Sequence, residues 1–510
     1  MSHPKQFPIL LCLTLFFLCG CSKDNALEEE SKGTTETTTE SVNVVFRLQS
    51  NQTSILTRAT ETVEDSGDPK TGSSAEYYVK KARVYFFDSS TKLFTKSVEL
   101  TDFTPDPASG WIYETKPILA PQGHYDIFVT ANTDRVINKD TEDEFLADID
   151  NLTYAQGEIT DISNGIVMAN RAVDNLNTEI KKSNTAGDVI PINITLERVV
   201  ARLDVAVNQD EFELTYGSKP YATVKIKDFY IVNYPTSYYT YRHIATLTTL
   251  NEPVWTIPTN FDYIQVKDQA NSFVIDPYFF KKKPDVTDFD NQDNYYANYY
   301  GNLKKYDDPN SINWKALYPA NPLDPQFVTS YCLENCMLAP AQKNGYSTGV
   351  LFNATMEPYN NVYRLNSAED ALEKVTDPAQ YAATIYYYDY QFFNSSKAVE
   401  FYVKQQNPGA TEVQYEAPKF EKSDDGHYHC YYKYWIRHLD NHDNNLMGVM
   451  EFAIVRNNYY RMLVTSVKDL GYSGKAIIEP NPDIPDEGEA RLKVVLNVKP
   501  WVLRKIDVEL

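Results

Sequence analysis

The 510-residue sequence is poor in long apolar runs, and the one that stands out is too short to span a bilayer. It extends from Phe7 to Leu18, roughly twelve residues, whereas a membrane-spanning helix needs about 20. The run lies at the extreme N-terminus behind Lys5. This position and length are typical of a signal peptide, which is removed and takes no part in the fold.

Basic residues are also scarce. The chain has 48 Lys and Arg against 70 Asp and Glu, a net charge of −22. Binding to nucleic acid or to an anionic bilayer surface requires clustered Lys and Arg, so this balance disfavours both kinds of partner. Solubility and mutual repulsion are the simpler consequences of the excess negative charge.

Cysteine is too rare for a disulfide-based fold. Of the six cysteines, Cys12 and Cys19 leave with the signal peptide and Cys21 lies at its end, which leaves Cys332, Cys336 and Cys430 in the folded part. An odd number cannot form a complete disulfide framework. One bridge between two of the three and three buried free thiols are both compatible with the sequence.

Motifs of catalysis and of cofactor binding are missing as well. The sequence contains no Walker loop or HExxH helix, and its plentiful acids single out no glycosidase pair. His427, His429, His438 and His442 crowd around Cys430 with spacings that occur in zinc sites. Asn and Asp residues mark a turn there, so we predict structural or solvated histidines, no metal, no cofactor and no enzymatic activity.

The signal peptide ends in a short motif that places a cysteine at the expected cleavage point. Leu18-Cys19-Gly20-Cys21 resembles the lipobox at which bacterial lipoprotein precursors are cut before a cysteine that is then acylated. Cys21 is therefore the predicted lipid (palmitate) attachment site, and an ordinary secretory leader is the alternative. Lys23 and the acids after it resemble the tag that sends Bacteroidetes lipoproteins to the outer membrane surface. Residues 22–40 lack apolar periodicity and predict a flexible tether.

The remaining sequence predicts a mainly β protein with a few short helices. Thirty-nine tyrosines accompany Thr, Val, Ile and Phe in short runs broken by turn residues. The length favours two domains, which we place at 41–209 and 210–510, with an insertion at 281–325. Helices are predicted at 142–151, where Thr141 and Glu144 match a capping box, and at 367–375.

The two ends of the folded chain carry similar apolar stripes. In the first strand, Val42, Val44, Phe46 and Leu48 alternate with other residues. In the last segment the stripe is Val502, Ile506, Val508 and Leu510, preceded by Trp501 and interrupted by Arg504. Either segment could therefore fill the same kind of groove. The alternative is that both are ordinary edge strands of their own domains.

If the chain were cut after the first strand, the C-terminal segment of another subunit could take the place of that strand. Arg58-Ala59 lies in a polar segment that a trypsin-like protease would reach. Removing the first strand would expose a groove with unpaired backbone groups, into which the C-terminal strand of a neighbouring subunit could insert. Four buried apolar side chains contribute on the order of 6 to 12 kcal/mol before ordering costs. Such a contact joins two different surfaces of the subunit. It need not close into a ring, so repeated contacts yield a filament.

Several segments resemble the fimbrillin family of Bacteroidales, the subunits of type V pili, and in particular its minor-fimbrium shaft branch. Three of the matching segments lie in the N-terminal half of the chain and four lie in the C-terminal half. They are Thr57-Arg58-Ala59, VYFFD at 84–88, ITLERVVARLDV at 194–205, YCLENC at 331–336, STGVLFNAT at 347–355, CYYKYWIRH at 430–438 and GVMEFAIVRNNYYRMLVTSVKDLG at 448–471.

This resemblance implies two β-sandwich-like (transthyretin-like) domains and a surface pilus subunit that supports adhesion. Carried over to this sequence, it implies lipidation of Cys21, cleavage at Arg58-Ala59 by an arginine-specific protease and insertion of Trp501–Leu510. Arg47 is a rival cut site. The implied partners are identical subunits together with tip and anchor fimbrial proteins. The alternatives are a tip or anchor subunit, a surface glycan-binding lipoprotein that stacks tyrosines on sugars, and a surface hydrolase.

Overall fold

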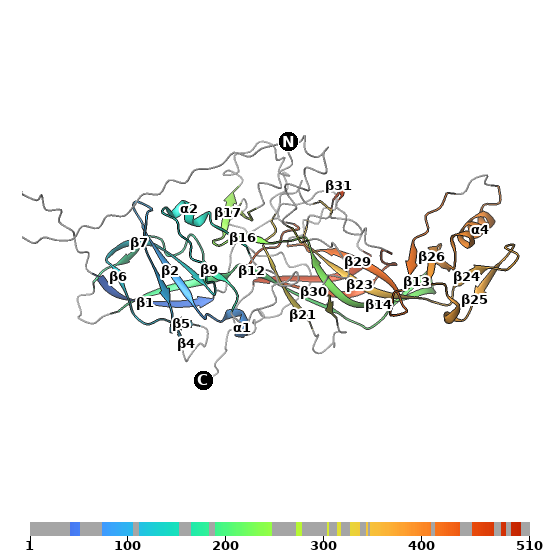
Figure 1. The fold of residues 1–510 in the computed structure, drawn as a ribbon, viewed down its shortest axis with the longest axis horizontal. Helices are drawn as coiled ribbons and strands as arrows, with labels where there is room; N and C mark the ends of the chain where they lie inside the picture. The colour runs from blue at the N-terminus through green and yellow to red at the C-terminus, as the bar shows by residue number, and fades with distance from the viewer. Residues whose placement is uncertain are drawn as a thin grey trace, which may run out of the picture. The chain divides into compact units, whose positions relative to one another are not determined.

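The computed structural model confirms that the protein is mainly β (Figure 1). Ser41–Leu510 forms one compact unit. Within the described part of the chain, no helix is both long and apolar enough to cross a membrane. The residues that the structure describes are 41–50, 74–105, 112–151, 165–182, 189–246, 272–277, 303–304, 314–317, 327–336, 343–344, 347–409, 414–438, 451–473, 481–485 and 491–500.

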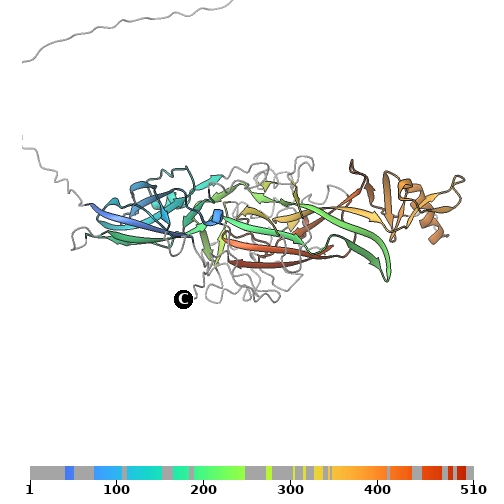
Figure 2. The same ribbon diagram turned by 90° about the horizontal axis from the view of Figure 1, so that it is seen from below.

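The first sheet has ten strands in the order β3-β2-β7-β9-β11-β1-β5-β4, with β10 beside β7 and β6 beside β1. Phe46 of β1 contacts Phe86 of β2 edge-to-face, although three strands separate them in the sheet order. The sheet therefore folds over and buries one core between its two halves (Figure 2). The strands are β1 (Ser41–Ser50), β2 (Ala82–Asp88), β3 (Phe94–Leu100), β4 (Thr104–Pro105), β5 (Ile112–Glu114), β6 (Ile118–Pro121), β7 (Gly123–Ala131), β9 (Met168–Asn170), β10 (Thr178–Ile180) and β11 (Ile190–Arg198).

Two short helices accompany this sheet, α1 (Ser74–Tyr77) and α2 (Glu142–Leu146). The predicted cap of α2 is confirmed, because Thr141 Oγ1 accepts a hydrogen bond from Glu144 N. The predicted extent to residue 151 is wrong. Thr240 N donates to Asp148 O, and β8 (Ile149–Asn151) pairs with β16 (Ser237–Tyr239), so the backbone after α2 is used in a strand pair.

The second and third sheets share one large core. The second has the order β21-β12-β30-β32 and the third the order β13-β14-β23-β29, with β20 beside β14. Their strands are β12 (Val200–Val207), β13 (Phe212–Tyr216), β14 (Lys219–Val232), β20 (Lys315–Ala316), β21 (Val328–Leu333), β23 (Gly349–Pro358), β29 (Tyr428–Trp435), β30 (Asn458–Val467) and β32 (Leu492–Pro500).

The chain passes from the first sheet to the second at Val199, between β11 and β12. The sequence predicts one continuous strand over 192–207, which the structure divides between two sheets. Val199 N donates to Val167 O, and Asn457 N donates to Val200 O, so different neighbours bind the backbone on each side of the break. The division into domains near Gln209 stays a prediction, and most of the predicted insertion 281–325 lies outside the described residues.

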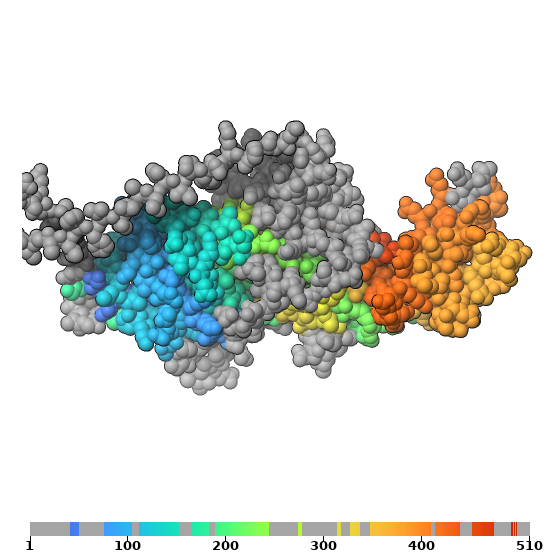
Figure 3. Space-filling view, in the orientation of Figure 1, coloured from blue at the N-terminus to red at the C-terminus, as the bar shows by residue number. Residues whose placement is uncertain are grey.

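A fourth sheet has the order β25-β24-β27-β26-β28, and its residues appear in orange on the surface in Figure 3. The predicted helix at 367–375 is wrong. Asn366 Oδ1 accepts from Asp370 N and Ala371 N, which forms a turn that returns the chain as a strand. An unpredicted helix, α4, covers one face of the sheet. The elements are β24 (Val362–Leu365), β25 (Leu372–Val375), β26 (Thr384–Tyr388), β27 (Gln391–Phe393), α4 (Ser396–Gln406) and β28 (Lys419–Glu421).

Four further strand pairs and one 3-10 turn complete the described elements. The pairs are β8 with β16, β15 (Tyr234–Pro235) with β19 (Leu303–Lys304), β17 (His243–Thr246) with β18 (Ser272–Ile275), and β22 (Lys343–Asn344) with β31 (Asn481–Pro485). The turn is η5 (Pro378–Gln380). These pairs connect segments that are far apart in the sequence.

Candidate functional site

The first strand, β1, lies inside the first sheet and has neighbours on both sides. It runs parallel to β11, with Val44 opposite Ile190. On its other side it pairs antiparallel with β6, where Val42 lies opposite Ala120, and with β5, where Leu48 lies opposite Tyr113. Of the two arrangements that the sequence left open for this segment, the edge strand is therefore not the one observed. We call the space between β11 and the β5–β6 segment the β1 slot.

The four apolar side chains predicted to share one face of β1 all point into the core. Val44, Phe46 and Leu48 have no exposed surface, and Val42 is 7% exposed. Phe46 packs edge-to-face on Phe86 with ring centres 6.2 Å apart. The strand thus fills four pockets of the core, and a replacement would have to present apolar side chains at alternate positions.

A side chain that the sequence analysis did not single out binds the middle of β1. Thr115, 4% exposed, accepts a hydrogen bond from Phe46 N through Oγ1, and its own N donates to Phe46 O, both at 3.0 Å. One strand further, Gln49 Nε2 donates to Thr195 Oγ1. Thr115 lies between β5 and β6, where its hydroxyl replaces a backbone carbonyl of the ladder. A single threonine in a strand-like segment gives no sequence signal of this role.

The two candidate cut sites differ in what the structure shows. Arg47 lies within β1, and its Nε donates to Glu114 Oε2 at 2.8 Å with both side chains half-exposed. Its backbone belongs to a strand that is paired on both sides. Arg58 and Ala59 lie outside the described residues, as does Cys21. The donor residues Trp501, Val502, Ile506, Val508 and Leu510 also lie outside them.

Helix α1, which begins at Ser74, is held by contacts with residues outside β1. Glu76 of α1 is 1% exposed, and both of its carboxylate oxygens accept from Arg202 Nη1 at 3.0 Å. Tyr331 Oη donates to the same carboxylate, and Arg198 Nε donates to Glu76 O. Because Arg202 and Tyr331 belong to the second sheet, α1 remains attached to that sheet whether or not β1 is present.

The three cysteines of the folded part are all free and buried. Burial raises the pKa of the Cys430 thiol to about 12 and that of Cys332 well above its usual range. Neither of these two thiols is ionised near neutral pH, so both act as small apolar side chains. The disulfide alternative is therefore wrong for this structure.

The three histidines of the cluster that the structure describes are held by protein groups. His427 Nδ1 bonds Glu357, His429 bonds Asn353 and Asp425, and His438 Nδ1 bonds Tyr460 Oη at 2.7 Å. His442 lies outside the described residues. Among the residues that the structure describes, no three His, Cys, Asp or Glu side chains are arranged to hold a metal ion.

His438 is expected to make stability fall in acid. Burial lowers its pKa from 6.5 to about 3, and Arg242 adds to the effect. The folded protein then keeps the ring neutral while the unfolded chain protonates it, so stability is complete above pH 6.5 and decreases as the pH falls toward 3. From pH 7.5 to 5 the loss is about 2 kcal/mol. Denaturant titrations should show it in the wild type and in His427→Gln but not in His438→Gln; an equal loss in His438→Gln would contradict it.

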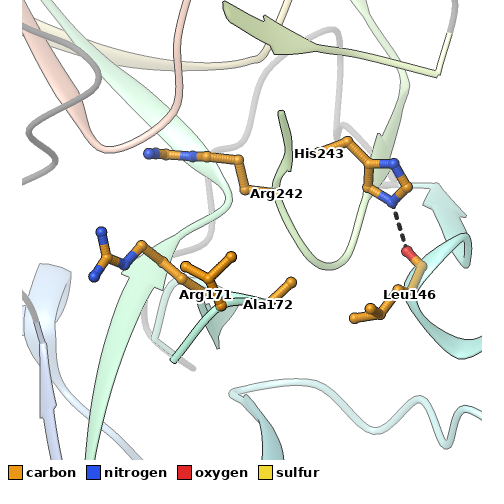
Figure 4. A pocket seen from close by; sticks show the side chains of 6 residues that line it. Leu146, Arg171, Ala172, Arg242 and His243 are labelled. Atoms are coloured by element: carbon orange, nitrogen blue, oxygen red, sulfur yellow. Dashed lines mark hydrogen bonds between the residues drawn. The ribbon is translucent and has the colours of Figure 1, made fainter. Parts of the chain in front are cut away.

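A pocket of about 240 Å³ lies beside the first sheet (Figure 4). Its polar groups are already engaged. Arg171 forms two hydrogen bonds with Asp174, Arg242 Nη2 donates to Arg456 O, and His243 Nε2 bonds Leu146 O at 2.7 Å. The pocket is lined by Leu146, Arg171, Ala172, Val173, Arg242 and His243.

Two family models match the chain, one over each of its ends. The model described as "Major fimbrial subunit protein (FimA)" matches residues 44–198, which begin inside β1 and end with β11, the strands of the first sheet. The model described as "Major fimbrial subunit protein type IV, Fimbrillin, C-terminal" matches residues 426–507, which include β29, β30 and β32. No curated protein sequence matches the chain.

Solved structures match the chain at low sequence identity. A fimbrilin (fimA) from Porphyromonas gingivalis W83 is 13% identical, with 92% of this chain and 99% of that chain covered and a TM-score of 0.40. A putative cell adhesion protein from Parabacteroides distasonis is 12% identical, with 91% and 97% covered and a TM-score of 0.40. The tip fimbrial protein Mfa3 from Porphyromonas gingivalis, with C-terminal truncation, is 12% identical, with 91% and 100% covered and a TM-score of 0.34.

A mainly β chain whose first sheet and C-terminal strands both match models of fimbrial subunits is a structural subunit of a cell-surface fimbrium. Both matched regions are therefore similar to fimbrillin subunits. This assignment rests on the two family models, and it confirms the family that the sequence motifs predicted.

Proposed function

We propose that the chain forms a fimbrial shaft by donor-strand exchange, in which β1 is removed after cleavage at Arg58 and the next subunit's Trp501–Leu510 fills the β1 slot. The observation that carries this proposal is the interior position of β1. A strand that is paired on both sides and fills four core pockets leaves, on removal, two rows of unpaired backbone groups and an apolar groove.

Two further features support cleavage at Arg58 over Arg47. A protease binds its substrate as an accessible extended segment, and the backbone at Arg47 is occupied by ladder bonds to β5 and β11. The contacts of Glu76 with Arg198, Arg202 and Tyr331 hold the chain after the cut. The cleaved protein therefore keeps the rest of the first sheet attached while β1 dissociates.

The remaining steps follow from the leader and from the C-terminal strands. The chain is exported as a lipoprotein acylated at Cys21 and reaches the outer membrane, where an arginine-specific protease acts on it. The donor residues directly follow β32, which pairs antiparallel with β30. Identical subunits form the shaft, and tip and anchor fimbrial proteins complete it. The role of this protein is mechanical assembly in support of adhesion.

Treatment of purified protein lacking the leader with an arginine-specific protease is expected to give a new N-terminus at Ala59 and ladders of oligomers on a denaturant-free gel. Arg58→Ala should block trimming, and the matched variant Arg47→Ala should be trimmed like the wild type. N-terminal sequencing and electron microscopy provide the readouts. Trimmed protein that stays monomeric at high concentration would refute assembly by this route.

The donor is tested separately by deleting Trp501–Leu510. The truncated chain is expected to fold and to be trimmed at Ala59, but to form no filaments by itself. Added to trimmed wild-type subunits, it should accept a donor strand and terminate the chain. Filaments made from the truncated protein alone would show that the C-terminus is not the donor.

A further inference from the structure

A lysine and two buried carboxyl groups meet beside the first sheet, away from the β1 slot. Lys92 lies in the turn between β2 and β3, Asp126 on β7, and Glu142 at the start of α2. Lys92 Nζ bonds Asp126 Oδ2 and lies 3.4 Å from Glu142 Oε2. The side chain of Asp126 is 1% exposed, that of Glu142 is 11% exposed, and that of Lys92 is half-exposed. We call these three residues the Lys92 triad.

The backbone holds Lys92 in this position. Its φ of 59° lies in the left-handed region, which a lysine adopts only when its surroundings require it. Lys92 N donates to Asp88 O at 2.8 Å, and Lys92 O accepts from Glu142 N at 2.9 Å. The same hydrogen bond therefore places the lysine and Glu142 next to each other. This pre-arranged geometry is more than a surface ion pair needs.

The second oxygen of Asp126 is held by two donors. Oδ1 accepts from Asn177 N at 2.7 Å and from Ser89 Oγ at 2.9 Å. Two fixed donors on one carboxyl oxygen are the arrangement that stabilises the negative charge of a tetrahedral intermediate in acyl transfer. The other oxygen, Oδ2, faces the amine. Glu142 Oε2 is buried and lies 3.4 Å from Lys92 Nζ, and the Glu142 carboxyl shares a hydrogen bond with Asp126.

We propose that the Lys92 triad is a modification site at which Lys92 and Asp126 form an intramolecular amide bond, with Glu142 carrying protons between them. Neutral Nζ attacks Asp126 Cγ, the carbon–nitrogen bond forms, and the carbon–Oδ2 bond breaks. The ammonium and carboxylate together contain every atom of the amide and of the one water that leaves. Both protons that Oδ2 needs come from Nζ, so the step requires no oxidant, reductant or cofactor.

The two carboxyls start in different protonation states. Against the effect of burial, hydrogen bonds from Lys92 and Asn177 lower the pKa of Asp126, so this group starts as the carboxylate. Burial, with the nearby charge of Asp126, raises the pKa of Glu142 to about 7, so this group both gives and takes protons near neutral pH. The bond to Asp126 raises the pKa of Lys92. Lys92 therefore starts as the ammonium, and the first step is the transfer of one of its protons within the triad. The two carboxyl groups that flank the amine are close enough to accept that proton directly.

The bond would join the β2–β3 turn to β7 across 34 positions of sequence. A filament subunit carries tension along its chain, and hydrogen-bonded strands at the edge of a sheet separate more readily than a covalent link. An amide here would prevent the β2–β3 hairpin from detaching from the sheet under load. This inference is independent of which strand occupies the β1 slot.

Mass spectrometry of the full purified chain under denaturing conditions tests the proposal. The intact mass is expected to be one water below that of the sequence from the observed N-terminus, and digestion should yield one branched peptide joining Lys92 to Asp126. Lys92→Arg and Glu142→Gln, which keep size and hydrogen-bonding groups, should restore the full mass. Lys225→Arg, at the exposed ion pair with Asp210, should still lack the water.

A wild-type chain with the full mass would show that the triad is an ion pair only and would overturn the proposal. A branched peptide that persists in Glu142→Gln would overturn the proton-carrying role of Glu142 and leave the bond itself established. Because circular dichroism and digestion rates report folding separately, a variant that fails to fold is recognised before its mass is interpreted.

Discussion

Replacement of Phe46 by alanine is expected to lower the free energy of unfolding of the uncleaved protein by about 3–5 kcal/mol. The ring has no exposed surface and packs on Phe86 in the core of the first sheet. Its loss leaves a cavity that a sheet closed on both sides of β1 cannot collapse to fill. Denaturant unfolding of the protein before proteolysis measures the change.

The same substitution gives the strongest test of strand replacement. If β1 is absent from the filament, Phe46→Ala and wild-type filaments should dissociate at the same denaturant concentration, because the mutated residue has been removed. Phe94→Ala is the matched control in the uncleaved protein, since Phe94 is 40% exposed and its loss should cost much less. Filaments weakened by Phe46→Ala would mean that β1 remains in place.

Replacement of Glu334 by alanine is expected to destabilise the protein by about 3–5 kcal/mol. Arg456 Nε donates to Glu334 Oε2 at 2.7 Å, and both side chains are at most 3% exposed. Removing the carboxylate leaves a guanidinium buried without its negative partner. Arg456 also donates to the carbonyl oxygens of Tyr239 and Thr240, so the loss should extend to the β16 region.

An exposed ion pair provides the control for this experiment. Lys225 and Asp210 form a comparable contact near the surface, and exposed pairs contribute about 0–1 kcal/mol. Asp210→Ala should therefore leave the unfolding midpoint nearly unchanged. Hydrogen exchange at the amides of residues 237–239 should rise in Glu334→Ala and not in Asp210→Ala. Equal effects of the two substitutions would contradict the role given to burial.

The successes of the sequence analysis depend on signals that act over a few residues. Alternation of apolar side chains predicts which face of β1 is buried, because successive residues of a strand point to opposite sides. The Thr141 and Glu144 pair predicts where α2 begins, because a cap is a local hydrogen bond. The errors also arise locally, where one hydrogen-bonding pattern competes with another. At Asn366 a side-chain turn replaced the predicted helix, and at Ser395 an N-cap for α4 passed unnoticed.

The sequence by itself determined that this is an acidic, mainly β protein with three cysteines in its folded part and with motifs that resemble those of fimbrillins. Tertiary structure alone decided that β1 lies between β11 and the β5–β6 segment, that Thr115 binds its centre, and that Lys92 meets Asp126 and Glu142. The physical reason is the distance along the sequence over which each interaction acts. A period of two records which face of a strand is buried, but the choice of neighbouring strand depends on contacts between residues that the chain places far apart.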